Sequence, residues 1–293
     1  MMHAHQHFLQ QLYTTDLFSR SVSKQVCAAL EEDLGSGDIH GGLYSADQRV
    51  QARIISRENA ILCGKPWVEE VFRQLGDHVK LNWLIAEGER VTADQTIVEL
   101  TGPAAPLLAG ERCALNFMQL LMGCATTTAQ FLSHLEGSQT KLLDTRKTIP
   151  GLRLAQKYAV CIGGGNNHRI GLWDAFLLKE NHIAATGSLI AAIDKARKLS
   201  PSQFLEIEVE TLEQLEQAIV AGVDRILLDN FPIEMLQQAV QLREQHQSQV
   251  QLEASGNVTE LTLGQIAATG VDYVSTGAMT KHVQAIDLSL RIY

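Results

Sequence analysis

A cluster of side chains that could bind an anion lies between Lys141 and His182. This segment holds seven lysines and arginines against three acidic residues, a formal charge of +4, and three glycines at residues 163–165 interrupt it. The whole chain has a formal charge of −9 and a pI of about 5.6. A nucleic-acid-binding surface would spread over one face and raise the pI. The segment therefore favours a small polyanionic ligand, and we expect no nucleic-acid partner.

Polar residues follow a series of short apolar runs in the second half of the chain. In α/β proteins with parallel strands, binding and catalytic residues lie at the carboxyl ends of the strands. The residues at these predicted strand ends are, in order, Asp144-Thr145-Arg146-Lys147, Lys179, Glu208, Asp229, Ser255-Gly256-Asn257 and Thr276-Gly277-Ala278. The first ends are cationic, the middle ends are anionic, and the last two are small and contain glycine. The sequence therefore predicts three kinds of binding group around one mouth.

The cationic group could bind carboxylates or pyrophosphate, and arginine can do so through two parallel hydrogen bonds. Its members are Arg146, Lys147, His168, Arg169 and Lys179. The two glycine-bearing turns each end a predicted strand and precede a predicted helix, where backbone N–H groups can bind a phosphate. Two such turns at the last strands match the usual phosphate site of an α/β barrel.

The anionic group contains Glu208 and Asp229 on successive predicted strands. Carboxylates in this position suit ribose hydroxyls or a hard cation such as Mg²⁺. Glu206 and Glu210 lie on the same alternating face as Glu208, so spacing alone does not settle which glutamate points into the mouth. The residues alone indicate a barrel enzyme that binds a phosphorylated sugar and a second partner rich in carboxylates.

Alternating strand and helix patterns must position these groups. After Lys141, short apolar runs such as ILL and FLL alternate with amphipathic segments every ~20–28 residues, which predicts parallel βα units with strands buried on both faces. Six such strands favour either an α/β barrel or an open doubly wound sheet.

The first half of the chain has a different pattern. Residues 21–33 are predicted to form a helix, and residues 50–103 to form short strands with one helix at about 66–76. A long helix is predicted over residues 109–135. Arg112 lies near the predicted start of that helix, where a cation opposes the helix dipole. We therefore expect Arg112 to serve something other than its own helix.

The composition fits a globular protein. The chain has 293 residues, of which 45% are hydrophobic, enough for one large domain or two ordinary ones. No apolar run reaches the roughly 18 residues of a membrane span, and the N-terminus does not read as a secretory signal. The five cysteines include no CxxC pair. These features predict a cytoplasmic protein without a membrane partner.

Several motifs together resemble the quinolinate phosphoribosyltransferase family, the carboxylating nicotinate-nucleotide pyrophosphorylases, and the similarity covers nearly the whole chain. The motifs are LEEDLGSGDIH (30–40), GERCALNF (110–117), DTRKTIPGLR (144–153), IGGGNNHRIGLWDAFLLKENH (162–182), EIEVET (206–211), LLDNF (227–231), EASGNV (253–258) and VSTGAMT (274–280).

The resemblance implies transfer of the phosphoribosyl group of phosphoribosyl pyrophosphate to quinolinate. The products are nicotinate mononucleotide, pyrophosphate and CO2, Mg²⁺ is the cofactor, and the reaction belongs to de novo NAD biosynthesis. It also implies an α/β fold with two domains. Residues 1–120 form an N-terminal α/β sandwich domain, which the C-terminal tail can join, and residues 121–293 form an incomplete α/β barrel. The expected assembly is a homodimer or a hexamer.

The family's functional residues carry over onto matching positions. Arg112 matches an arginine that reaches the active site of the neighbouring subunit. Arg146, His168, Arg169 and Lys179 match the quinolinate-binding set, with Thr145 and Lys147 beside them and Lys147 also reaching phosphate groups. Glu208 and Asp229 match residues at the ribose and the metal. Ser255, Gly256, Asn257, Thr276, Gly277 and Ala278 match the loops that bind the 5′-phosphate. We expect the catalytic residues to be Lys147, Lys179, Glu208 and Asp229.

Three alternatives stay open from the sequence. One is the related phosphoribosyltransferase-like protein encoded with molybdate transporters, which shares the fold. Another is a Schiff-base aldolase with Lys179 as its nucleophile. The third is a sensor that binds phosphoribosyl pyrophosphate without consuming it. Activity with quinolinate, borohydride trapping on Lys179 and release of pyrophosphate would separate them.

Overall fold

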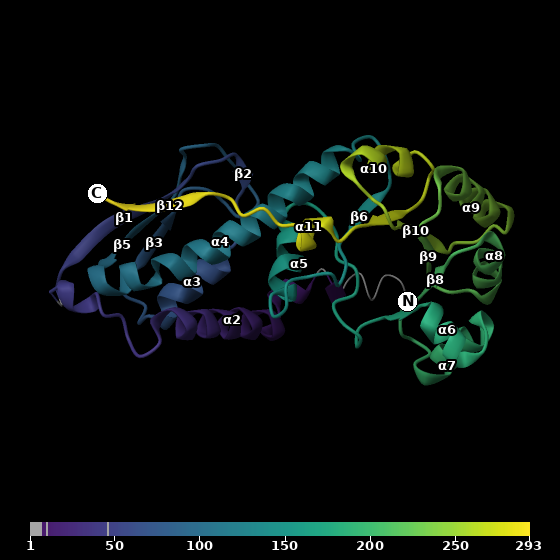
Figure 1. The fold of residues 1–293 in the computed structure, drawn as a ribbon, viewed down its shortest axis with the longest axis horizontal. Helices are drawn as coiled ribbons and strands as arrows, with labels where there is room; N and C mark the ends of the chain where they lie inside the picture. Colours follow the sequence, from purple (N-terminus) through teal and green to yellow (C-terminus); the bar gives the residue numbers. More distant parts are fainter. Residues whose placement is uncertain (1–7, 10, 46) are drawn as a thin grey trace. The chain divides into compact units, whose positions relative to one another are not determined.

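The computed structural model describes residues 8, 9, 11–45 and 47–293 (Figure 1). The chain forms two compact units. The antiparallel-sheet unit comprises residues 12–129, 148–164 and 279–293, and the parallel-sheet unit comprises residues 130–147 and 165–278 with the described residues before Leu12. Among the described residues, no helix combines the length and the apolar character that crossing a membrane requires.

A four-stranded antiparallel sheet with the strand order β12-β1-β5-β3 forms the centre of the first unit. The four strands are β1 (Arg49–Ser56), β3 (Lys80–Trp83), β5 (Thr96–Pro103) and β12 (Leu288–Ile292). A smaller pair consists of β2 (Ala60–Ile61) and β4 (Arg90–Val91). The strands and the helix predicted for this region are confirmed, and the C-terminal strand β12 completes the sheet by pairing with β1.

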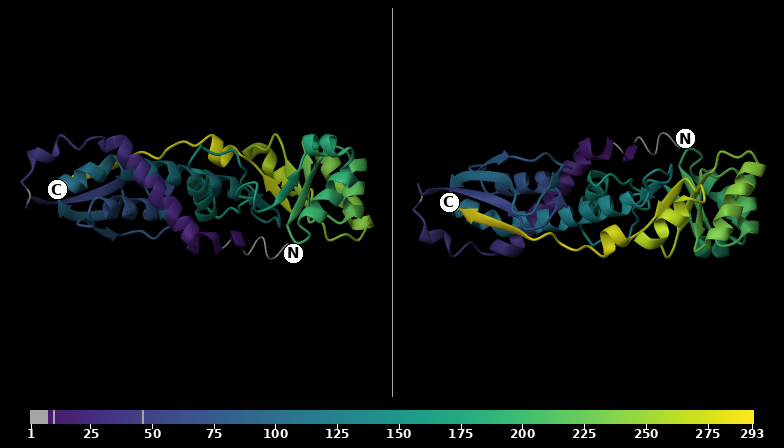
Figure 2. Two further views of the ribbon diagram at one scale, coloured as in Figure 1. Left: turned by 90° about the horizontal axis from the view of Figure 1, so that it is seen from below. Right: turned by 90° about the horizontal axis from the view of Figure 1, so that it is seen from above.

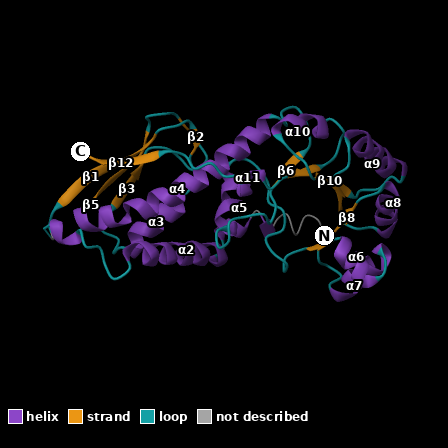
Figure 3. Cartoon of the chain, viewed as in Figure 1, coloured by secondary structure: helices purple, strands orange, loops and turns teal. Residues whose placement is uncertain are grey.

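Helices provide the other half of this unit's core. They are α2 (Asp16–Leu34), α3 (Lys65–Gln74), the first part of α4 (Ala104–Ser133) and α5 (Arg153–Ile162), with short 3-10 turns η1 (Leu12–Thr14) and η2 (Gly41–Leu43) (Figure 3). Trp67 of α3 lies at the centre, where its ring packs against Phe18, Phe117 and Tyr158 and its indole N–H donates to Gln25 at 2.8 Å. The burial of these large rings stabilises the unit mainly through the hydrophobic effect.

The long helix is confirmed, but it begins at Ala104 and not at the predicted residue 109. Arg112 therefore lies more than two turns inside the helix, beyond the first turn in which the helix dipole acts. The expectation that Arg112 opposes the dipole is wrong. Its side chain is exposed on α4 in the antiparallel-sheet unit.

The glycine run has a packing role at its first residue. Gly163 ends α5, and a Cβ added there would lie 2.4 Å from the backbone oxygen of Ala125 on α4 and 2.8 Å from Cβ of Thr128. No side chain fits in this space, because real Cβ atoms do not approach a backbone oxygen so closely. The glycine allows the end of α5 to pack directly on α4.

The parallel-sheet unit contains the six strands that the sequence predicts. They are β6 (Lys141–Leu143), β7 (Phe176–Leu178), β8 (Leu205–Val209), β9 (Arg225–Asp229), β10 (Gln251–Ser255) and β11 (Tyr273–Ser275). All neighbouring pairs are parallel, in the order β6-β11-β10-β9-β8-β7. In the described part of the chain β6 and β7 do not pair, so the sheet curves without closing, as expected for an incomplete barrel.

Helices cover the outer face of this curved sheet (Figures 1 and 2). They are α6 (Glu180–Thr186), α7 (Leu189–Leu199), α8 (Leu212–Ala221), α9 (Ile233–Gln245) and α10 (Glu260–Ala267). The four-residue helix α11 (Ala278–Lys281) follows β11. Because all six strands are parallel, their carboxyl ends lie at the same edge of the sheet.

The strand register places the polar residues of this sheet in rows. Paired residues of parallel strands point to the same side. Asp229 pairs with Ser255, and Ser255 pairs with Ser275, which forms one row at the carboxyl end. Glu208 pairs with Leu227, and Leu227 pairs with Glu253, which forms a second row one step deeper.

Candidate active site at the carboxyl edge of the parallel sheet

An ion pair joins two of the predicted catalytic residues. Lys179 directly follows β7, and its Nζ lies 2.5 Å from Oε2 of Glu208 on the neighbouring strand β8. Burial raises the pKa of Glu208, the ion pair with Lys179 lowers it, and the negative charge of Asp229 raises it again, with a net increase. Asp229 therefore lies close enough to repel Glu208, and the structure brings Lys179, Glu208 and Asp229 together as predicted.

The three glutamates of β8 and its end have different surroundings. Glu208 is 9% exposed and faces Lys179 at the edge, Glu206 is 1% exposed and lies deeper, and Glu210 is exposed to solvent. The side chains alternate along the strand, but their depth depends on how far each residue lies from its end. The structure therefore settles the alternatives that spacing left open, with Glu208 at the mouth.

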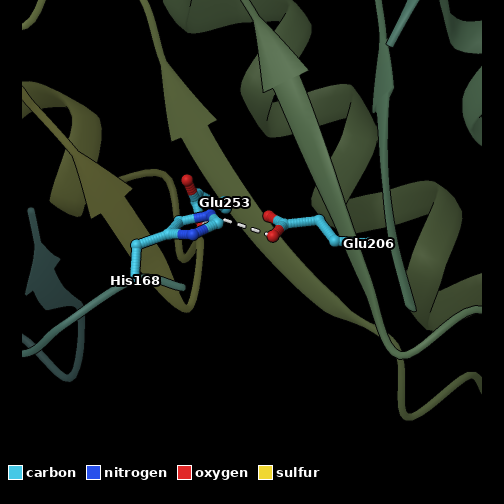
Figure 4. A group of neighbouring side chains, drawn as sticks. All are labelled: His168, Glu206 and Glu253. Carbon is cyan, nitrogen blue, oxygen red and sulfur yellow. Dashed lines mark ion pairs between the residues drawn. The ribbon is translucent and has the colours of Figure 1, made fainter. Parts of the chain in front are cut away.

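A buried charged network lies beneath the mouth (Figure 4). Nε2 of His168 lies 2.9 Å from Oε2 of Glu206 on β8 and 3.6 Å from Oε2 of Glu253 on β10. Nη1 of Arg225, at the start of β9, lies 3.1 Å from the same Glu253 oxygen. The Arg225 guanidinium stacks 4.1 Å from the ring centroid of Tyr273. The site roles of Arg225 and Glu253 were not predicted, although a charged residue inside an apolar strand is a signal that the sequence offers.

Burial determines the protonation of this network. Burial, followed by the charge of Glu206, raises the pKa of Glu253 to about 7. Burial also raises the pKa of Glu206, while Arg225 opposes the increase. Both carboxylates are buried, and the charge of Glu206 raises the cost of charging Glu253, so the network holds a proton more tightly than exposed carboxylates do.

The same three side chains, His168, Glu206 and Glu253, are close enough to hold a metal ion. The local hydrogen bonds favour an ion-pair network instead. The backbone N–H of Arg169 donates to Nδ1 of His168 at 2.7 Å, so the neutral ring carries its proton on Nε2 and has no lone pair there for a metal. Arg225 already supplies a positive charge at Glu253.

Two aspartates of the basic stretch hold the loop that carries His168 and Arg169. Asp144 is fully buried, and its carboxylate accepts hydrogen bonds from the His168 N–H at 2.8 Å and from Nδ2 of Asn167 at 2.6 Å. The carboxylate of Asp174 accepts the backbone N–H groups of Ile170 and Gly171, both at 2.8 Å. These acids therefore stabilise the loop that presents the cations, a role that counting charges does not reveal.

The first and last strand ends are in contact. The N–H of Lys147 donates to Oγ1 of Thr145 at 3.0 Å. A Cβ added to Gly277 would lie 3.0 Å from Cδ of Lys147 and 3.2 Å from the Thr145 hydroxyl, so the glycine makes room for the lysine.

Nε of Arg146 is buried and has no hydrogen-bond partner among the described residues. A buried guanidinium nitrogen of this kind fits an anionic ligand.

The two predicted phosphate loops lie on neighbouring strands. Ser255 is the last residue of β10, Gly256 and Asn257 follow it, and Gly256 has a φ of 90°, which favours glycine. Residues 276–278 follow β11, and the N–H of Ala278 donates to Oγ1 of Thr276 at 3.2 Å. Ser255 and Ser275 are paired in the sheet, so both loops leave it at one edge.

Some predicted groups do not belong to this edge. Arg112 is part of the antiparallel-sheet unit, as are Arg153 and Lys157 of the basic stretch, which lie on α5. Lys157 is fully buried. The stretch from residue 141 to 182 is therefore divided between the two units, with residues 148–164 in the antiparallel-sheet unit. Proximity in sequence did not reveal this division.

The chain is similar to known proteins over most of its length. Residues 38–122 match the N-terminal domain and residues 124–291 the C-terminal domain of quinolinate phosphoribosyl transferase. It is 40% identical over 262 residues to a probable carboxylating nicotinate-nucleotide pyrophosphorylase of Bacillus subtilis, covering 89% of this chain and 90% of that protein. It is 38% identical over 268 residues to the carboxylating nicotinate-nucleotide pyrophosphorylase of Mycobacterium leprae, covering 89% and 94%.

The fold is also that of a solved structure. The nicotinate-nucleotide pyrophosphorylase of Francisella tularensis superimposes with a TM-score of 0.89 at 46% identity, covering 94% of this chain and 97% of that one. Both family domains, the relatives across nearly full length and the shared architecture agree with the resemblance seen in the motifs. The chain belongs to the quinolinate phosphoribosyltransferase family.

Proposed function

We propose that the carboxyl edge of the parallel sheet carries out the reaction of this family in NAD biosynthesis. The enzyme is a pentosyltransferase that moves the phosphoribosyl group of phosphoribosyl pyrophosphate to quinolinate, with release of pyrophosphate and CO2. One observation carries the assignment of this site: the strand register gathers Lys179, Glu208 and Asp229 at one edge, beside the loops that follow β10 and β11.

The cations of this edge suit the anionic ends of both substrates. Quinolinate brings two carboxylates, and phosphoribosyl pyrophosphate brings a pyrophosphate. Arg146 and Arg169 can bind such groups through paired N–H donors, whereas Lys147 and Lys179 act as compact charges. The buried Nε of Arg146 without a partner among the described residues supports this role. His168 has Nδ1 and Nε2 engaged by Arg169 and Glu206, so we assign it to holding Arg169 in place.

The carboxylates suit the ribose and a magnesium ion. Glu208 and Asp229 present oxygen donors, which Mg²⁺ prefers, and they are close enough to repel each other. A divalent cation would relieve this repulsion, so the donor set fits Mg²⁺. When bound, the ion would neutralise charge on the leaving pyrophosphate. Glu208 and Asp229 would also stabilise positive charge that develops on the ribose.

The protein contributes mainly by positioning and electrostatics. The pyridine nitrogen of quinolinate forms a bond to C1 of the ribose as the bond from C1 to the pyrophosphate oxygen breaks. The bond to the 2-carboxylate then breaks, CO2 leaves, and the ring carbon takes a proton. The cations would stabilise the pyrophosphate and the ring charge, and no covalent enzyme intermediate is required.

A second copy of the chain would complete the site. Arg112 is exposed on α4, and its neighbours Cys113 and Asn116 line a groove of about 610 Å³ between α2 and α4. We propose that this face meets the mouth of a partner subunit in a homodimer or larger assembly, so that Arg112 contacts the partner's substrate. We also propose that the enzyme works in the cytoplasm.

Product analysis tests the assignment. Purified protein is incubated with quinolinate, phosphoribosyl pyrophosphate and Mg²⁺, and nicotinate mononucleotide and pyrophosphate are quantified, with Glu208→Gln as the matched variant and Asn82→Ala as an exposed control on β3. We expect equal amounts of both products from wild type and Asn82→Ala and a loss of about 10²-fold or more for Glu208→Gln. Binding without pyrophosphate release would indicate a sensor, and an adduct trapped on Lys179 by borohydride would indicate an aldolase.

A further inference from the structure

We propose that Asn230 is a positioning residue that ties the carboxylate of Asp229 to the loop formed by Ser255, Gly256 and Asn257. The inference rests on the proposed function, because it assigns Asp229 to the ribose and this loop to the 5′-phosphate of one substrate. Asn230 directly follows Asp229 at the end of β9, and it is not among the predicted site residues.

Three hydrogen bonds connect Asn230 to both sides. Its backbone N–H donates to the Ser255 carbonyl at 2.9 Å. Its Nδ2 donates to Oδ2 of Asp229 at 2.8 Å. Its Oδ1 accepts from Nδ2 of Asn257 at 3.2 Å. The side-chain amide of Asn230 therefore donates to the Asp229 carboxylate and accepts from the loop. A carboxylate in its place would have no donor for Asp229, so this hydrogen bond would be lost.

The backbone at this place is specialised. Asn230 has a φ of 55°, Gly256 a φ of 90° and Asn257 a φ of 51°. Asparagine tolerates the left-handed region better than most residues do, and glycine adopts it freely. A Cβ on Gly256 would lie 2.1 Å from Oδ1 of Asn230, so the loop packs directly on the amide. Two segments in unusual conformations that fit around one side chain indicate a fixed arrangement rather than an accidental contact.

This arrangement fixes the distance between Asp229 and the loop formed by Ser255, Gly256 and Asn257. The 5′-phosphate and the ribose hydroxyls belong to one molecule and are only a few bonds apart, so the loop and Asp229 must be held at matching positions for both to bind. The amide of Asn230 links the two binding groups directly. Asn230 and Asn257 are exposed, so water can replace their hydrogen bonds in the folded protein when the side chain is removed. We therefore expect substitution to change substrate binding more than folding.

The test compares two ligands in three variants. Asn230→Gly keeps the left-handed backbone and removes the amide, Asn230→Asp keeps the size but replaces the donor, and Asn82→Ala is an exposed asparagine on β3. Kinetics give KM for each substrate, and calorimetry gives Kd for ribose 5-phosphate and for quinolinate. We expect both Asn230 variants to raise KM for phosphoribosyl pyrophosphate and Kd for ribose 5-phosphate about fivefold to tenfold, with quinolinate binding and the Asn82→Ala values unchanged.

The outcomes separate the inference from the proposed function. A wild-type protein without phosphoribosyltransferase activity would overturn the function itself. Active wild type with unchanged ribose 5-phosphate binding in both Asn230 variants would overturn the positioning role. Equal loss of affinity for both ligands would also overturn it, because that result indicates a general structural defect. If Asn230→Gly does not fold, Asn230→Asp carries the comparison.

Discussion

At the residue scale, the side chains that determine this site are of two kinds. Residues such as Lys179, Glu208 and Asp229 stand directly at or after strand ends, and the sequence alone predicted them because an apolar run followed by a polar residue is a local pattern. Glu253 and Arg225 could not be predicted in this way. Their roles depend on which strands are neighbours and on the register between them, and neither can be read from one segment.

The raised pKa of Glu253 predicts a pH-dependent stability. Burial and Glu206 raise this pKa from 4.5 to about 7 in the folded protein. The folded state then holds the proton more tightly than the unfolded state, so the stability is fully present below about pH 4.5 and is lost as the pH rises through about 7.

The variant Glu253→Gln keeps a neutral side chain at every pH, so its free energy of unfolding does not fall for this reason as the pH rises. Between about pH 5 and pH 8 we expect the free energy of unfolding of wild type to fall relative to Glu253→Gln by about 2 kcal/mol, measured by urea unfolding. Curves that stay parallel over this range would show that Glu253 does not hold the proton.

Two lysines are expected to assist decarboxylation. Lys147 and Lys179 lie at the mouth, and loss of CO2 leaves negative charge on the ring beside the new bond to nitrogen. Replacement of either lysine by methionine removes a charge that stabilises this state, and we expect single-turnover release of CO2 to slow by about 10- to 10³-fold in at least one variant. Wild-type rates in both Lys147→Met and Lys179→Met would show that other groups stabilise the ring.

At the element scale, most of the fold followed from periodicity, since the long helix, the strands of residues 50–103 and the six parallel strands were all predicted and observed. The boundaries of the elements were predicted less accurately. Helix α4 begins five residues earlier than expected, which removed the dipole argument for Arg112. The pairing of β12 with β1 joins residues far apart in sequence, which a local pattern cannot reveal.

Gly163 is predicted to limit the packing of α5 on α4. A methyl group there would lie 2.4 Å from the Ala125 backbone oxygen, so Gly163→Ala should force the two helices apart and lower the free energy of unfolding by about 1–3 kcal/mol. Gly264→Ala is the matched control. Gly264 lies in helix α10, and the nearest atom to a Cβ added there is the backbone oxygen of His134 at 3.5 Å, an ordinary contact. Thermal unfolding of both variants checks the prediction, and equal melting temperatures would contradict it.

At the scale of the whole molecule, the active site is proposed to need two chains. Arg112 lies in the antiparallel-sheet unit and Arg146 in the parallel-sheet unit, so a variant of each can be combined. We expect Arg112→Ala and Arg146→Ala to be inactive alone, because each removes a cation that binds an anionic substrate.

Mixing the two variants should restore activity if the site is shared. In a hybrid dimer one mouth would have both arginines intact, so subunit exchange at equal amounts should recover up to about a quarter of wild-type activity. The control is a mixture of Arg146→Ala with Glu208→Gln, two variants of the parallel-sheet unit, which should stay nearly inactive. Failure to recover activity despite demonstrated exchange would count against a shared site.

The central claim is that this edge of the sheet joins quinolinate to the phosphoribosyl group and releases CO2. The most direct measurement is the release of labelled CO2 from quinolinate carrying the label in its 2-carboxylate, with pyrophosphate quantified in the same reaction. The account predicts one CO2 per pyrophosphate, only when phosphoribosyl pyrophosphate is present, and almost none with Glu208→Gln. Release of CO2 without phosphoribosyl pyrophosphate, or pyrophosphate without CO2, would contradict it.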